Sequence, residues 1–84
     1  MNQFDFYLEF DGKRTDEKAY DAPTDKVMAM NIRQAIEKIC KRKKLAMRQY
    51  EALTENTFRC YLIKKAFLKA DREYVYYIER KQPV

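Results

Sequence analysis

The sequence contains no histidine, no serine and no tryptophan, and only one glycine and two prolines occur among its 84 residues. Without histidine there can be no Ser-His or Cys-His nucleophile pair, no HExxH metal site and no acid–base pair of the ribonuclease type. A single glycine excludes the glycine-rich loops that hold nucleotide phosphates. Carboxylates, lysine, tyrosine and cysteine remain as catalytic candidates, but they show no distinctive spacing. We therefore predict that the protein is not an enzyme.

Metal and disulfide chemistry have little support in the sequence. Cys40 and Cys60 are the only cysteines, and they lack the paired spacing of zinc ligands. No secretory signal precedes them, so we expect both thiols to be reduced. The acidic residues near the N-terminus lack the regular ligand spacing of a calcium loop. The sequence predicts neither a metal nor a cofactor.

The length and composition are those of a single folded domain covering residues 1–84. Charged residues make up 37% of the chain and aromatic residues 14%, which is a globular rather than a disordered composition. No apolar run approaches the ~18 residues needed to cross a bilayer. The first residues lack the basic and apolar regions of a signal peptide. We expect a cytoplasmic protein with no membrane partner.

Residues 4–10 alternate strictly between apolar and polar side chains, which predicts a half-buried strand. Asp11-Gly12 follows and suits a two-residue hairpin turn, so we expect residues 13–22 to return as the second strand. In the resulting register, residues of opposite charge face each other across the two strands, and such pairs favour this register. These pairs are Glu9 with Arg14 and Asp5 with Lys18. The inner face of the return strand is poorly apolar, so a frayed edge strand or a bulge remains an alternative.

A central amphipathic helix is predicted over about residues 25–44. Pro23 ends the preceding strand, and Thr24 or Asp25 can cap the helix. Its apolar residues recur at helical spacing and form one stripe. They are Met28, Ile32, Ala35, Ile36, Ile39 and Cys40. The basic run 41–44 closes the helix, where cations meet the negative end of its dipole.

The C-terminal half is expected to form antiparallel strands over about residues 46–53, 58–67 and 74–80, separated by short polar breaks. A competing interpretation makes residues 57–69 a second helix, since Phe58, Leu62 and Ala66 also fall at helical spacing. We favour the strands. The predicted fold class is therefore α+β, with an N-terminal hairpin, one central helix packed on one sheet face, and C-terminal strands.

The net charge of +5 is unevenly distributed along the chain. Residues 1–25 hold seven acids and three bases, whereas residues 26–84 hold fifteen bases and six acids. The basic half indicates contacts to nucleic-acid phosphates, and its tyrosines could stack on exposed bases. The basic run also has a plainer explanation as a solvated helix end. The predicted binding residues are Lys38, Lys41, Arg42, Lys43, Lys44, Arg48, Arg59, Tyr61, Lys64, Lys65, Arg72, Tyr74 and Tyr76.

The succession of strand, Asp-Gly-Lys turn, strand, proline and amphipathic helix over residues 4–40 resembles many short proteins carried by phages and mobile elements. Some of these proteins inhibit host defence, so the resemblance implies an inhibitory role. Three functions follow as hypotheses. The first is binding to DNA, RNA or a nucleic-acid-processing complex. The second is a protein-binding inhibitor or adaptor of phage type, and the third and weakest is self-assembly.

Overall fold

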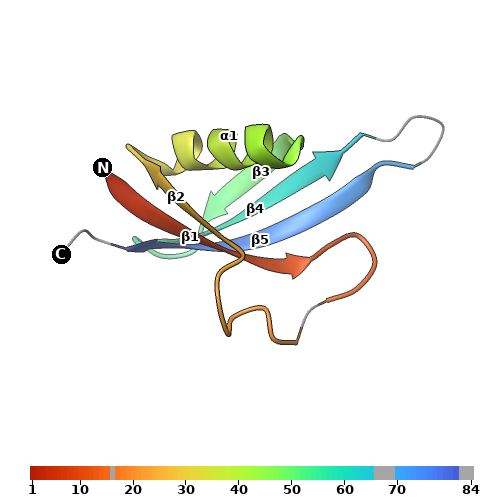
Figure 1. Cartoon of the computed structure of the whole chain (residues 1–84), viewed down its shortest axis with the longest axis horizontal. Coiled ribbons are helices and arrows are strands. Elements are labelled where there is room, and N and C mark those ends of the chain that lie inside the picture. Colours follow the sequence, from red (N-terminus) through yellow and green to blue (C-terminus); the bar gives the residue numbers. More distant parts are fainter. Residues whose placement is uncertain (16, 66–69, 82–84) are drawn as a thin grey trace.

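Alternating apolar side chains build a five-stranded antiparallel sheet whose one face is covered by a single helix, α1 (Figure 1). The computed structural model describes residues 1–15, 17–65 and 70–81. The strand order is β2-β1-β5-β4-β3. The strands are β1 (Asn2–Phe10), β2 (Asp25–Ala29), β3 (Ala46–Ala52), β4 (Thr57–Lys64) and β5 (Arg72–Lys81). This arrangement confirms the α+β class.

Both ends of α1 (Ile32–Lys43) are set by local interactions. The side chain of Asn31 accepts a hydrogen bond from the Gln34 N–H at 2.9 Å and caps the N-terminus. At the other end Lys44 adopts the left-handed conformation with φ 59°, and its N–H donates to the Cys40 carbonyl. A residue in this conformation reverses the chain direction. The chain therefore turns directly from the helix into β3.

The core lies between α1 and the sheet. The helix contributes its buried apolar side, and every second residue of the inner strands meets it. The fully buried side chains are Phe4, Phe6, Val27, Ala29, Ala35, Ile36, Ile39, Cys60, Leu62 and Ile78. Phe6 meets Tyr76 edge to face, with ring centroids 5.8 Å apart. Burial raises the pKa of the Cys60 thiol to about 12, so this cysteine packs as a small apolar residue.

The predicted N-terminal hairpin with residues 13–22 is wrong. The hairpin partner of β1 is β2, with Phe4 opposite Val27 and Phe6 opposite Asp25. Among the described residues of this segment, one bridge to β1 is formed, between Phe10 and Thr15, and it lies outside the expected register. The return segment 13–22 offers few apolar side chains to the helix side of the sheet. Val27 and Ala29 do offer them, and their burial decides the pairing.

The predicted start of the helix at about residue 25 is also wrong. Residues 25–29 form β2, and α1 begins at Ile32. Val27 and Ala29 are buried and alternate with exposed residues, which is strand periodicity. Met28, assigned from the sequence to the helical stripe, instead lies on the strand and is 47% exposed. The remainder of the predicted stripe, from Ile32 onward, is confirmed.

The predicted C-terminal meander is confirmed, because β3, β4 and β5 occur in sequence order and pair antiparallel. The competing second helix over 57–69 is contradicted for residues 57–64, which form β4. The rest of that interpretation, and the last residues of the predicted strand 58–67, fall on residues 66–69, outside the described part. Since β5 pairs with both β1 and β4, it joins the N-terminal and C-terminal halves into one sheet.

Candidate functional site

The two sides of the sheet carry different charge. We call the side that α1 covers the helix side and the opposite side the open face. Alternation along the strands gives the open face five acids and four bases, which nearly cancel. The helix side, counted over its strand residues, α1 and Lys44, holds nine bases and two acids. The positive charge of the chain is therefore concentrated on the helix side.

Three of the four cations of the open face are engaged by acids. Arg59 on β4 reaches across β5 to Glu9 on β1 and donates two hydrogen bonds, at 2.8 and 3.1 Å. Arg48 pairs with Glu73 at 3.3 Å, and Lys81 on β5 pairs with the nearby Glu79 at 3.2 Å. Arg48 and Arg59, both predicted to bind a ligand, are therefore already partnered within the fold.

The Glu9–Arg59 pair is the best-built electrostatic contact of the open face. Burial raises the pKa of Glu9, but hydrogen bonds from Arg59 and Tyr20 outweigh this and leave that pKa lowered. The hydrogen bond to Glu9 raises the pKa of Arg59 in turn. Tyr20, whose hydroxyl donates to Glu9, comes from the loop between β1 and β2 and packs on Tyr7 and Tyr77. The pair therefore fixes the loop to the open face.

Replacing Glu9 by glutamine (Glu9→Gln) is expected to lower the free energy of unfolding by about 1–2 kcal/mol at pH 7, because charge-assisted bonds are lost. A carboxylate whose pKa is lowered by folding stabilises the fold above its unfolded pKa, and this contribution disappears as pH falls through the folded pKa. The difference should therefore shrink in urea titrations as the pH falls below the ordinary pKa of a glutamate and vanish below the lowered pKa of Glu9. Glu51→Gln, at an exposed acid opposite Arg59 in the register, is the matched control, with a change below about 0.5 kcal/mol. Equal effects of the two variants would contradict this account.

The basic run at the end of α1 divides into two pairs. Arg42 and Lys43 both bind the nearly buried Asp25 at the start of β2, at 3.3 and 3.2 Å. They fasten the end of the helix to the sheet edge. Lys41 and Lys44 are exposed, and neither forms an ion pair with any residue in the described ranges. Lys41 and Lys44 are therefore the two residues of the run without an acidic partner in the described chain, whereas Arg42 and Lys43 share the single negative charge of Asp25.

Two strand residues add positive charge beside this helix end. Lys64 and Arg72 face each other across β4 and β5, and alternation places both on the helix side. Lys64 is exposed and has no acidic partner within the described chain. Arg72 donates from Nε to the Asp11 carbonyl at 2.8 Å, which is a neutral acceptor. Since Ala46, two residues after Lys44, pairs with Ile63, the helix end and this strand end are neighbours.

We call Lys41, Lys44, Lys64 and Arg72 the basic corner. The sequence placed all four among its binding residues, and the fold brings them to one end of the helix side. Two other predicted cations have their own contacts. Lys38 donates to the Met28 carbonyl at 2.7 Å, and Lys65 pairs with Asp71 at 3.1 Å.

The three predicted stacking tyrosines do not form one platform. Tyr61 lies on the open face and donates to Glu51 at 3.3 Å. Tyr74 and Tyr76 lie on the helix side, because β5 alternates. Tyr76 is only 3% exposed and belongs to the core, so it cannot contact a ligand. Burial raises its pKa to about 12. Tyr74 is partly exposed. Of the three tyrosines it is the accessible one on the side of the sheet that carries the basic corner.

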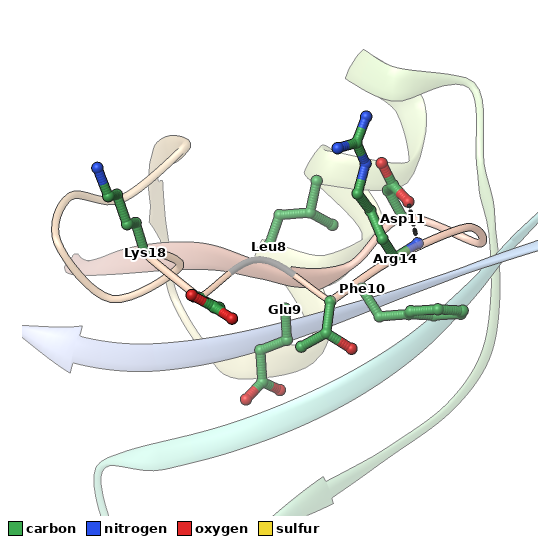
Figure 2. A pocket seen from close by; sticks show the side chains of 8 residues that line it. Leu8, Glu9, Phe10, Asp11, Arg14 and Lys18 are labelled. Carbon is green, nitrogen blue, oxygen red and sulfur yellow. Dashed lines mark hydrogen bonds between the residues drawn. The ribbon is translucent and has the colours of Figure 1, made fainter.

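A hollow of about 530 Å³ lies between the end of β1 and the loop that follows it (Figure 2). Its charged lining is mixed and includes Glu9, Asp11, Arg14 and Lys18. Figure 2 shows Leu8 and Glu9 on opposite sides of the β1 ribbon. The Asp11 carboxylate accepts hydrogen bonds from the backbone N–H groups of Arg14 and Lys13. These bonds lower the pKa of Asp11. These contacts shape the loop, and the mixed charges favour no one class of ligand.

Two features of the open face and the helix end have little signal in the sequence. The first is the cluster of Tyr7, Tyr20 and Tyr77 on the open face, since Tyr20 reaches it from a loop. The alternation of residues 4–10 does point Tyr7 to that face, so part of the signal is present. The second is the role of Asp25, which pairs with two cations of the basic run. Only the position of β2 beside the helix end reveals that contact.

Within the described residues, no group of three or more potential metal-binding side chains comes together. No helix in this part of the chain is long and apolar enough to cross a membrane. Comparisons of the chain with protein-family models, with curated proteins and with solved structures found no match to any of them.

Proposed function

We propose that the protein binds nucleic acid, alone or within a nucleic-acid-processing complex, through the basic corner. The observation that carries this proposal is that Lys41, Lys44 and Lys64 gather at one end of the helix side without acidic partners in the described chain. Arg72 adds a fourth cation, which donates to the Asp11 carbonyl and whose charge also contributes to lowering the pKa of the Asp11 carboxylate. Clustered lysines and arginines that lack acids attract the phosphate backbone of nucleic acids.

The plainer explanation, a helix end that complements its own dipole, accounts for part of this set only. The dipole favours cations in the last turn of the helix, which includes Lys41 and its neighbours. Lys64 and Arg72 lie on strands, so the helix dipole does not explain why basic residues occupy these positions. Their presence at the same corner therefore supports a contact with an external polyanion.

The test compares two double variants, each of which loses two positive charges. One loses them from the basic corner and the other from the open face. Lys41→Gln with Lys64→Gln is expected to weaken binding to a fluorescent oligonucleotide about tenfold near 100 mM salt, since two phosphate contacts are lost. Lys26→Gln with Lys81→Gln removes the same charge from the open face and should change affinity much less. Fluorescence anisotropy measures both. Equal losses in the two variants would contradict a site at the basic corner.

A second candidate function is binding of a protein, as an inhibitor or adaptor. It is favoured by Tyr20, which is 57% exposed although it packs edge to face on Tyr77 at 5.5 Å. Tyr20, Arg59, Tyr77 and Glu79 line a shallow hollow of about 360 Å³, and tyrosine and arginine are frequent in the energetic centres of protein interfaces. A purified partner that stays bound after nuclease treatment, and is lost with Tyr20→Ala but not with the lysine variants, would favour this function.

A further inference from the structure

The helix side of the sheet is not fully covered by α1. The hairpin of β4 and β5 extends beyond the C-terminal end of the helix (Figure 1). Tyr74 is the third residue of β5 and lies opposite the buried Leu62 of β4. Its ring packs against the edge of the core but remains partly exposed. A partly exposed aromatic side chain thus stands in contact with Arg72, on the same side of the sheet as Lys64.

Arg72 and Tyr74 form a cation–π pair at this place. The guanidinium carbon of Arg72 lies 5.5 Å from the centroid of the Tyr74 ring. The same guanidinium group is held by the Asp11 carbonyl at 2.8 Å, so its position is fixed before any ligand arrives. Guanidinium groups and tyrosine rings are the side chains on which unpaired nucleic-acid bases stack.

From this geometry, and resting on the nucleic-acid binding proposed above, we infer that the ligand is a single-stranded nucleic acid. One of its bases stacks on the Arg72–Tyr74 pair, while Lys41, Lys44 and Lys64 contact the flanking phosphates. In a duplex, bases already stack on each other and present only their edges in the grooves. A duplex would therefore use the lysines and leave the Arg72–Tyr74 pair without a stacking partner.

The experiment compares three probes of equal length with the full chain at low salt. These are oligo(dT), an abasic chain that carries the same phosphates without bases, and a duplex. We expect oligo(dT) to bind about 5- to 100-fold tighter than the abasic chain, the range that stacking one base provides. Oligo(U) should behave as oligo(dT) does, because every base has a stacking face.

Single substitutions test whether the preference for oligo(dT) over the abasic chain comes from the Tyr74 ring. Tyr74→Leu should bring oligo(dT) down to the affinity of the abasic chain without changing the salt dependence, whereas Tyr74→Phe should keep the preference. Tyr61→Leu, on the opposite face of the sheet, is the matched control and should also keep it. Far-UV circular dichroism and urea titration verify that each variant is folded. A Tyr74→Phe variant that loses the preference while remaining folded would contradict stacking at this ring.

The possible failures are distinguishable. If oligo(dT) and the abasic chain bind equally with the same salt dependence, the corner binds phosphates alone, and the stacking inference is wrong while the proposed function stands. If the duplex binds as tightly as oligo(dT), the single-strand preference is wrong. If none of the three probes binds at low salt, the proposed function itself is wrong.

Discussion

Raising the salt concentration from about 50 to about 200 mM is expected to weaken oligonucleotide binding about 15- to 60-fold. Each phosphate that a lysine or arginine neutralises releases condensed counterions, so the logarithm of the binding constant falls linearly with the logarithm of salt. For a single strand the slope is about −0.7 for each phosphate contacted. The four cations of the basic corner therefore predict a slope between about −2 and −3.

The slope also reports how many cations take part. Lys41→Gln with Lys64→Gln should reduce its magnitude by about 1.4, because two phosphate contacts disappear. Lys26→Gln with Lys81→Gln should leave the slope unchanged, although the net charge falls by the same amount. A fluorescence anisotropy series at five salt concentrations is sufficient. A wild-type slope near zero would show that the corner makes no phosphate contacts.

The second large effect concerns the core. Phe6→Ala is expected to lower the free energy of unfolding by about 3–5 kcal/mol, since it removes a fully buried aromatic ring and leaves a cavity. The contact with Tyr76 at 5.8 Å is lost as well. A domain of 84 residues has a total stability of about 4–12 kcal/mol. The variant should therefore lose a large fraction of its stability and unfold at a clearly lower urea concentration.

Urea titration followed by far-UV circular dichroism measures this effect, because the chain has no tryptophan to serve as a fluorescent probe. Met28→Ala is the matched control. It also shortens a large apolar side chain on a strand, but Met28 is 47% exposed, so the change should stay within about 0.5 kcal/mol. A loss below about 1 kcal/mol in Phe6→Ala would be inconsistent with a core between the helix and this strand.

The parts of the fold that the sequence predicts well are those in which local periodicity and burial agree. From Ile32 to Cys40 the apolar residues recur at helical spacing, and this side of α1 is the one that packs on the sheet. The C-terminal strands also follow from local composition and short polar breaks. In both cases the pattern lies within one element and does not depend on distant partners.

The errors arise where distant segments compete for the same partner. The Asp-Gly turn and the complementary charges of residues 13–22 favour a local hairpin, and these signals are visible in the sequence. Residues 25–29 displace that segment because Val27 and Ala29 bury apolar surface that the charged return segment lacks. The advantage appears only once α1 covers the sheet, so local reasoning does not detect it.

The sequence predicted which residues belong to the candidate site, but not which of them share a face of the sheet or are paired with acids. The cations of the basic corner were identified, as were others that the fold neutralises, such as Arg42 and Arg59. Alternation along β5 already assigns Tyr74 and Tyr76 to one face and separates them from Glu73. Deciding that Tyr61 lies on the other face requires the register between β4 and β5, which comes from the structure.

The position of β5 between β1 and β4 sets the order in which the sheet can assemble. Before β5 joins, the chain can hold two separate strand pairs, β1 with β2 and β3 with β4. Neither pair has its inner neighbour until Arg72–Lys81 docks between them. The sheet then closes in one late step with long sequence separation, which is slow. Until that moment the inner edges of β1 and β4 are exposed to other chains.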